Sequence, residues 1–206
     1  RAIYVNSSMT GVNVLVGAEG EVALEGDIEA GVKARIDATG TDLSLALNTG
    51  DVQEVQSLRY DDDGNPILGG AVRQTVDSEV AAPDIDVQAR TASLGGHLNA
   101  DGATGGDIDV AVDGGLSMGG TLTARGNAGD GGDIAIEASG RLLENSGSYV
   151  DASGTADGGT ITVDNTGGRS FHSGNYFAGG ITGSGGTIAL TADELNLLSP
   201  TLSATG

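Results

Sequence analysis

A short phrase, Gly-Gly-x-Ile-x followed by Val, Ile or Leu, occurs four times in this chain at nearly constant spacing. The copies begin at Gly105, Gly131, Gly158 and Gly185, so that successive first glycines lie 26, 27 and 27 residues apart. Self-similarity at a fixed period of this size is typical of a solenoid, in which each repeat buries its apolar face only against its neighbours. The repeat therefore constrains the fold much more tightly than it constrains the function.

Within each repeat the apolar residues fall at every second position, with small polar or charged residues between them. This period of two is typical of β-strands, in which alternate side chains face the core. Aligning the repeats predicts four rows of like residues. The rows are Ile108, Ile134, Ile161 and Ile188; Val110, Ile136, Val163 and Leu190; Leu98, Leu122, Val150, Ile181 and Leu202; and Ala100, Ala124, Ala152, Gly183 and Ala204.

Short strands separated by glycines, with no helical periodicity, predict an all-β parallel β-helix with coils of about 21–27 residues. Each strand would pair with its equivalent one coil along, about 4.8 Å away. The 37 glycines of the 206 residues would mark the corners, where positive φ values cost glycine little. A meandering β-sandwich is the rival architecture, but it does not require one residue type at one repeat position.

We interpret residues 1–206 as a single β-helix segment, an excerpt of a longer or processed chain. Residues 1–49 follow the repeat as irregular coils, and 83–206 follow it regularly. Between them, 50–82 break the pattern, and within this range 56–68 carry apolar flanks around an Asp/Gly/Asn/Pro turn, which is a hairpin signal. We therefore expect one protruding, hairpin-like insertion at 50–82.

The chain is strongly acidic, with 29 Asp and Glu against 9 Lys and Arg, a net charge of −20. Without a basic stripe it is not expected to bind nucleic acid, and without an apolar run of membrane-spanning length it is not expected to insert into a membrane. We interpret the acids as a solvated outer surface that opposes aggregation; divalent-cation binding between stacked carboxylates is the alternative. The acids expected to point outward are Asp107, Asp109, Asp133, Glu137 and Asp151.

The Gly-Gly-x-Ile-x-Val strand, followed by a Leu/Val-x-Ala-Ser/Asp-Gly phrase, resembles the repeats of filamentous-haemagglutinin-like exoproteins, the adhesins of bacterial two-partner secretion. The similarity is best at 122–136 and 150–163, good over 84–206 and loose over 12–49. The resemblance implies a right-handed parallel β-helix, export to the cell surface or beyond, and a role in adhesion or surface filaments. Because neither end of the repeat array carries a cap, we expect neighbouring β-helix coils, end to end, of the same or an identical chain as partners; the adhesion role that the resemblance implies adds cell-surface glycans.

Few residues are candidates for chemistry, and we expect no catalytic residue and no cofactor. Asp61, Asp62, Asp63 and Asn65 are rich in oxygen ligands, as calcium sites are, but they lack the spacing of an EF-hand, so a plain turn is the favoured interpretation. His97 and His172 lie far apart in repeat register and have no neighbouring cysteine, which argues against a metal or triad role. Phe171, His172, Tyr176 and Phe177 either pack over a widened corner or form an exposed patch; packing is favoured.

Three classes of function fit a chain of this kind. The first is a structural module of a secreted adhesin or extracellular filament, and this is the function we expect. The second is a carbohydrate-active β-helix, a lyase or hydrolase, for which Asp109, Arg125 and Asp151 are the candidate residues. The third is a passive polysaccharide- or ice-binding surface. Its candidates are the outward threonines Thr121, Thr123, Thr160, Thr162 and Thr187.

Overall fold

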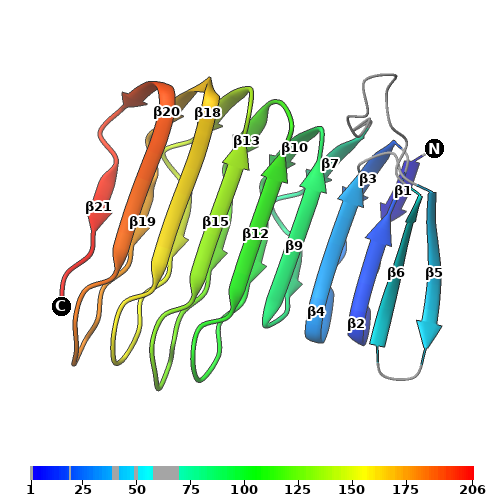
Figure 1. Ribbon diagram of the computed structural model, residues 1–206, viewed down its shortest axis with the longest axis horizontal. Coiled ribbons are helices and arrows are strands. Elements are labelled where there is room, and N and C mark those ends of the chain that lie inside the picture. The colour runs from blue at the N-terminus through cyan, green and yellow to red at the C-terminus, as the bar shows by residue number, and fades with distance from the viewer. Residues whose placement is uncertain (1, 19, 39–41, 49–50, 58–69) are drawn as a thin grey trace.

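The computed structural model describes residues 2–18, 20–38, 42–48, 51–57 and 70–206. Across these residues the chain forms strands joined by turns and loops, and 19 of the strands belong to one continuous sheet wound into a parallel β-helix (Figure 1). The expected fold class is thus confirmed. The N-terminal and C-terminal coils lie at opposite ends of the long axis.

Each coil contributes one strand, or one part of a long strand, to three ladders that run along the axis. Ladder A holds the Gly-Gly-x-Ile strands, which pair in parallel from coil to coil. Its strands are the second parts of β2 (Met9–Gly17) and β4 (Ile28–Ala38), then β9 (Asp84–Ala89), β12 (Asp107–Val112), β15 (Asp133–Ala138), and the first parts of β18 (Thr160–His172) and β20 (Thr187–Leu197).

Ladders B and C complete each coil in turn. Ladder B consists of β1 (Ala2–Val5), β3 (Glu21–Leu24), β7 (Ala71–Gln74), β10 (Thr91–Leu94), β13 (Leu116–Met118), β16 (Arg141–Glu144) and the second parts of β18 and β20. Ladder C consists of the first parts of β2 and β4, then β8 (Glu79–Ala81), β11 (His97–Asn99), β14 (Thr121–Thr123), β17 (Tyr149–Asp151), β19 (Asn175–Phe177) and β21 (Thr201–Ser203).

The coil length grows along the chain. In ladder A the register steps from Asp84 to Asp107, Asp133, Thr160 and Thr187, which gives coils of 23 to 27 residues. The first coils are shorter than the expected lower limit of 21: Ala2 pairs with Glu21, 19 residues on. The shorter coils lack the long glycine-rich loop that joins ladder C to ladder A in the later ones.

The interior consists of the predicted rows of aliphatic side chains. Ile85, Ile108, Ile134 and Ile161 follow one another in register in ladder A, and each is at most 1% exposed. Branched side chains suit this position because they pack well against their neighbours on a pleated surface. Burial of these rows provides the main favourable free energy of folding.

One predicted row needs correction in the coil that contains the aromatic residues. Tyr176, not Ile181, pairs with Val150 and Leu202; Tyr176 is fully buried, whereas Ile181 is 78% exposed. The small-residue row likewise continues through Ala178, not Gly183, because Ala152 N donates to Phe177 O and Ala178 N to Ser203 O. The favoured packing holds for His172 and Tyr176, whereas Phe171 and Phe177 are only partly buried. The expected widening of the corner is wrong, because the correct alignment lies five positions earlier and pairs Gly154 with Gly180.

The glycines allow neighbouring coils to approach each other closely; they do not provide positive φ values. Among the described glycines only Gly167, at φ 94°, lies in the left-handed region. A Cβ on Gly159 would lie 1.9 Å from Gly132 O of the preceding coil, and one on Gly158 would lie 2.0 Å from Ala178 O. The prediction that the glycines mark corners with positive φ is therefore wrong for the described glycines other than Gly167. Any side chain at Gly158 or Gly159 would collide with the backbone of a neighbouring coil.

The insertion begins and ends earlier than expected. Strands β5 (Asp42–Asn48) and β6 (Asp51–Ser57) form an antiparallel hairpin outside the main sheet. The main sheet resumes at Ala71 in β7, which pairs with both β3 and β10, so residues 71–82 belong to the coils and not to the insertion. The alternation in 42–47 predicts a coil strand equally well, because it satisfies parallel and antiparallel pairing alike. The hairpin expected at 56–68 lies largely outside the described residues.

Candidate functional site

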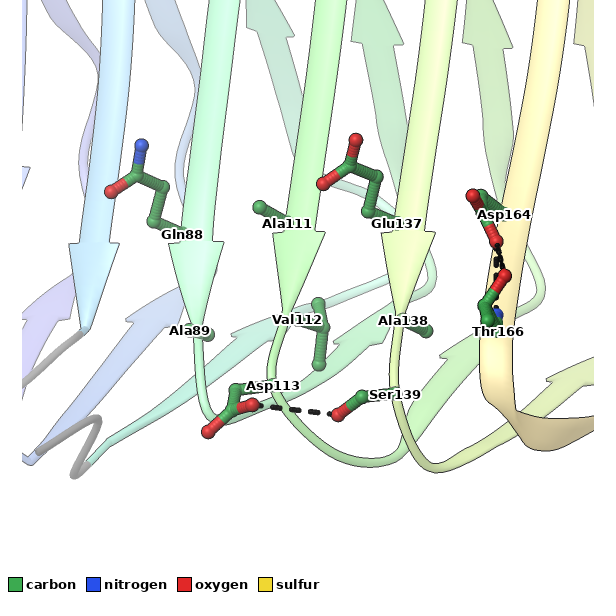
Figure 2. A pocket seen from close by; sticks show the side chains of 10 residues that line it. All are labelled: Gln88, Ala89, Ala111, Val112, Asp113, Glu137, Ala138, Ser139, Asp164 and Thr166. Carbon is green, nitrogen blue, oxygen red and sulfur yellow. Dashed lines mark hydrogen bonds between the residues drawn. The ribbon is translucent and has the colours of Figure 1, made fainter. Parts of the chain in front are cut away.

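A groove lies on the outer face of ladder A. Its larger part, of about 400 Å³, crosses β9, β12 and β15 where these strands end, and reaches the middle of β18 (Figure 2). A smaller part, of about 240 Å³, lies beside it and shares Gln88, Ala111 and Glu137 with it. We call the two parts together the ladder A groove.

The groove arises from one small residue in an outward row. Gln88, Ala111, Glu137 and Asp164 follow one another in register across four coils, and Figure 2 shows the long side chains of Gln88 and Glu137 on either side of Ala111. In the smaller part, Ala135 follows Asp109 in the same way. Methyl groups therefore form the floor, and polar groups stand at its edges.

Three carboxylates and two hydroxyls surround the larger part of the groove. Ser139 Oγ donates to Asp113 Oδ1 at 3.4 Å, and both Thr166 N and Thr166 Oγ1 donate to Asp164 Oδ1. These hydrogen bonds from Thr166 lower the pKa of Asp164, because they favour its ionised form. None of the residues that line the groove is basic. The groove is consequently an anionic surface with hydroxyl and amide groups at its edges.

Above the groove, carboxylates are stacked directly on one another. Asp84, Asp107 and Asp133 are consecutive in one outward row, and Lys33 Nζ lies 3.1 Å from Asp84 Oδ2 at the N-terminal end of that row. Partial burial, and then repulsion by Asp133, Asp84 and Asp109, raise the pKa of Asp107. Burial also raises the pKa of Asp86, although the nearby charge of Arg35 opposes this. Like charges directly opposite one another are destabilising in a sheet.

The fold does not bring the three residues weighed for a lyase into one site. Asp109 lies on β12 in ladder A, whereas Asp151 lies on β17 in ladder C and Arg125 follows β14 of that ladder. Hydrogen bonding to Asp101 and the charges of Asp101 and Asp151 raise the pKa of Arg125, so Arg125 and Asp151 lie near each other while Asp109 stands apart. Arg125 Nη2 lies 2.6 Å from Asp101 Oδ2. Burial opposes ionisation of Asp101, but the hydrogen bonds and charge of Arg125 outweigh it and lower the pKa of that carboxyl.

Asp151 also differs from its expected outward exposure, since it is only 4% exposed. Its two carboxylate oxygens accept hydrogen bonds from Tyr149 OH at 3.0 Å and Ser153 N at 2.9 Å. The Tyr149 ring packs against Phe177 in the next coil, with centroids 5.1 Å apart. Asp151 thus holds the end of β17 together, and this set of contacts accounts for its burial.

The two histidines occupy different environments, as their separation in the repeat indicates. His97 lies on the outside of ladder C, where its Nε2 is 3.0 Å from Thr123 Oγ1 and its Nδ1 is 3.5 Å from Glu79 Oε1. This Thr–His–Glu arrangement spans three successive coils, but Thr123 is 2% exposed. A substrate would have no access to that hydroxyl, so we assign the group a structural role.

A buried polar cluster of Glu144, Ser148, His172 and Tyr176 was missed by the sequence reasoning. Tyr176 OH donates to Glu144 Oε2 at 2.8 Å and lies 2.6 Å from His172 Nδ1; Ser148 Oγ also donates to Glu144. Burial, followed by the charge of Glu144, raises the pKa of Tyr176. The available signal was Glu144 itself, an acid at an inward position of the β16 alternation.

The remaining candidates give no defined site. Asp61, Asp62, Asp63 and Asn65, the candidate calcium loop, lie outside the described residues. Within the described ranges no group of three or more His, Cys, Asp or Glu side chains is arranged to hold a metal ion, and no helix there is long and apolar enough to cross a membrane. Comparison with protein-family models finds no match for this chain, and comparison with curated proteins finds no significant similarity.

Proposed function

We propose that this chain is a structural module of a secreted bacterial surface adhesin or extracellular filament, acting as an extended scaffold for attachment. The observation that supports the proposal best is the continuity of the rows. From β9 to β20 each ladder A strand pairs in parallel with the next, with no break in register from Asp84 to Thr187. A solenoid of this kind extends in one direction as coils are added, which suits a spacer better than a compact catalytic domain.

The last coil offers an edge on which a further coil would fit. Its inward residues Ile188 and Leu190 are only partly buried, whereas Ile161 and Val163, their equivalents one coil earlier, are at most 1% exposed. Leu202 is 46% exposed, although Tyr176, its neighbour in the row, is fully buried. A coil of the same chain or of an identical chain, paired in parallel, would bury these side chains and satisfy the free strand edges.

End-to-end stacking can be tested on the purified chain by sedimentation velocity over a range of concentrations. Association is expected, and Leu202→Glu should weaken it because the new charge lies at the stacking edge. Thr162→Glu, an outward substitution one coil earlier, is the matched control and should leave association unchanged. A chain that stays monomeric at every concentration, or equal effects of the two variants, would contradict stacking through this edge.

The attachment role needs a separate assay. Beads coated with the folded chain should bind to cells more than beads coated with Ile134→Asp, in which a charge enters the buried row and the coils are expected to unfold. Folding of both samples is checked by circular dichroism. Equal attachment of the two kinds of bead would refute a role that depends on the folded scaffold.

A further inference from the structure

The ladder A groove has the form of a subsite for a linear molecule. Its larger part extends from β9 across β12 and β15 to β18, so it crosses three coil steps, about 14 Å at the usual spacing of parallel strands. The groove lies across the strands and along the solenoid axis (Figure 2). A ligand that follows it must therefore be elongated.

The lining combines two kinds of surface. The outward methyl group of Ala111 provides the apolar floor, against which the C–H faces of a ligand can pack; Ala89 and Ala138 face the core and are at most 7% exposed. Gln88, Ser139 and Thr166 provide amide and hydroxyl groups beside the carboxylates. A mostly apolar floor with a few polar groups that fix orientation is the usual composition of a small-ligand site.

The charge of the groove decides which elongated ligands fit. Asp113, Glu137 and Asp164 line its larger part, and Asp86 and Asp109 line the smaller part. At one end Arg35 Nε lies 3.6 Å from Asp86 Oδ2 and Arg35 Nη2 donates to Gln88 Oε1 at 3.1 Å, so the carboxylates open to a ligand are those on the side of β12, β15 and β18. The whole chain adds a net charge of −20. An anionic polymer would be repelled, whereas ammonium groups would gain charge-assisted hydrogen bonds with these carboxylates.

We propose that the ladder A groove binds a linear glycan that carries free amino groups, with the ammonium groups on Glu137 and its neighbouring carboxylates and the pyranose C–H faces over Ala111. The hydroxyls of such a chain match Gln88, Ser139 and Thr166, and its repeat runs along the axis, as the groove does. This inference deepens the proposed attachment role, and it rests on that proposal only for its biological meaning. The binding site itself is defined by the groove.

Isothermal titration of the folded chain with short glucosamine oligomers tests the proposal. Mildly acidic pH keeps the amines protonated while most carboxylates stay ionised. We expect saturable binding of these oligomers and much weaker binding of the N-acetylated oligomers, which have the same backbone without the charge. Oligogalacturonate, which is anionic, should not bind. Saturable binding of the N-acetylated oligomers with equal affinity would refute the role of the carboxylates, and no saturable binding of any oligomer would refute the site.

Two variants locate the binding. Ala111→Gln fills the groove with the residue type that already stands at Gln88 in the same row, and Glu137→Gln removes a charge at nearly constant shape; each should weaken binding about tenfold or more. Thr162→Gln and Asp133→Asn change the same face outside the groove and should leave the affinity unchanged. If Asp133→Asn weakens binding as much as Glu137→Gln, the oligomer binds the acidic surface in general and the proposed site is wrong.

These outcomes are separable from those of the scaffold proposal. The titration reads binding to one chain and does not depend on stacking of coils at the β20–β21 edge. A chain that stacks and attaches to cells but does not bind amino glycans would overturn only the groove proposal. A chain that binds them at this groove but stays monomeric would overturn only the stacking.

Discussion

Two isoleucines of the same row, one inside the stack of coils and one at its edge, can each be replaced by alanine. The difference between the two losses of stability measures what a covering coil adds to the burial of the side chain. Ile134 is 1% exposed and lies between Ile108 and Ile161 in the row. Ile188 belongs to the same row, but it has a neighbour on one side only and is partly buried. The two positions share residue type, ladder and register.

Ile134→Ala should lower the free energy of unfolding by about 2–5 kcal/mol, because it removes buried methylene and methyl groups and leaves a cavity between two coils. Ile188→Ala should cost roughly half as much or less, since much of the side chain already contacts solvent. Ile134→Asp should lower the free energy of unfolding by more than about 4 kcal/mol, because the carboxylate would be buried without a partner. Urea unfolding followed by far-ultraviolet circular dichroism measures all three.

Two results would contradict the stacking of these isoleucines. If the two alanine variants lose the same stability, the row is not covered inside the stack in the way the structure shows. Wild-type stability of Ile134→Asp would refute the assignment of this residue to the interior. Amide hydrogen exchange around β15 and β20 provides an independent measure, because a repeat array can unfold from one end.

Three further predictions concern the polar groups and the glycines. Tyr176→Phe should cost about 1–3 kcal/mol in urea unfolding, because Glu144 and His172 lose the hydroxyl that lies 2.8 Å and 2.6 Å from them; no loss would mean that this hydroxyl is dispensable. Asp107→Thr, which copies the residue at Thr160 of the same row, should stabilise the protein by about 0.5 kcal/mol at neutral pH and low salt, and the gain should shrink at high salt. Folding raises the pKa of Asp107 above its ordinary value of 3.8. The contribution of Asp107 to the free energy of unfolding is therefore most favourable below pH 3.8, and it is lost as the pH rises through the pKa of the folded state. If Asp107→Thr leaves the dependence of stability on pH unchanged, this account is contradicted. Gly159→Ala should destabilise the protein by about 3 kcal/mol, because its Cβ would lie 1.9 Å from Gly132 O. In the control variant Gly147→Ala the new Cβ meets nothing within 4 Å, so its effect on stability should be nearly neutral. Equal thermal unfolding midpoints of the two variants would count against the close approach of the coils.

The repeating part of the fold could be predicted from the sequence because one residue type recurs at one position. Ile108, Ile134 and Ile161 needed no structure to be placed in one row. The row failed at Tyr176, where an aromatic ring fills the place of a branched aliphatic side chain. Ala178 and Gly180 still follow it at the usual spacing, but Ile181 is closer in residue type to the other members of the row, so residue type favours the wrong position here and spacing favours the right one.

The polar features were harder to predict, because they depend on contacts between coils. Alternation places Asp151 outside, yet Tyr149 and Phe177 pack over it and bury it. Glu144 and His172 look unrelated in the sequence, 28 residues apart, and they meet only because β16 pairs with β18. The groove depends on Ala111 being smaller than its two neighbours in the row, a difference that becomes visible only when the register is known.

The register itself is the claim on which the fold, the groove and the proposed scaffold all depend, and distances between spin labels measure it directly. The chain contains no cysteine, so labels can be attached at chosen pairs of outward positions. Lys33, Asp84 and Thr187 belong to one outward row of ladder A. The structure predicts backbone separations of about 24 Å for Lys33 to Thr187 and about 19 Å for Asp84 to Thr187, five and four steps of a parallel ladder. The two narrow distance distributions should therefore differ by about one strand spacing, although 51 residues separate Lys33 from Asp84. Broad distributions, or a difference far from one strand spacing, would contradict the stacked parallel coils.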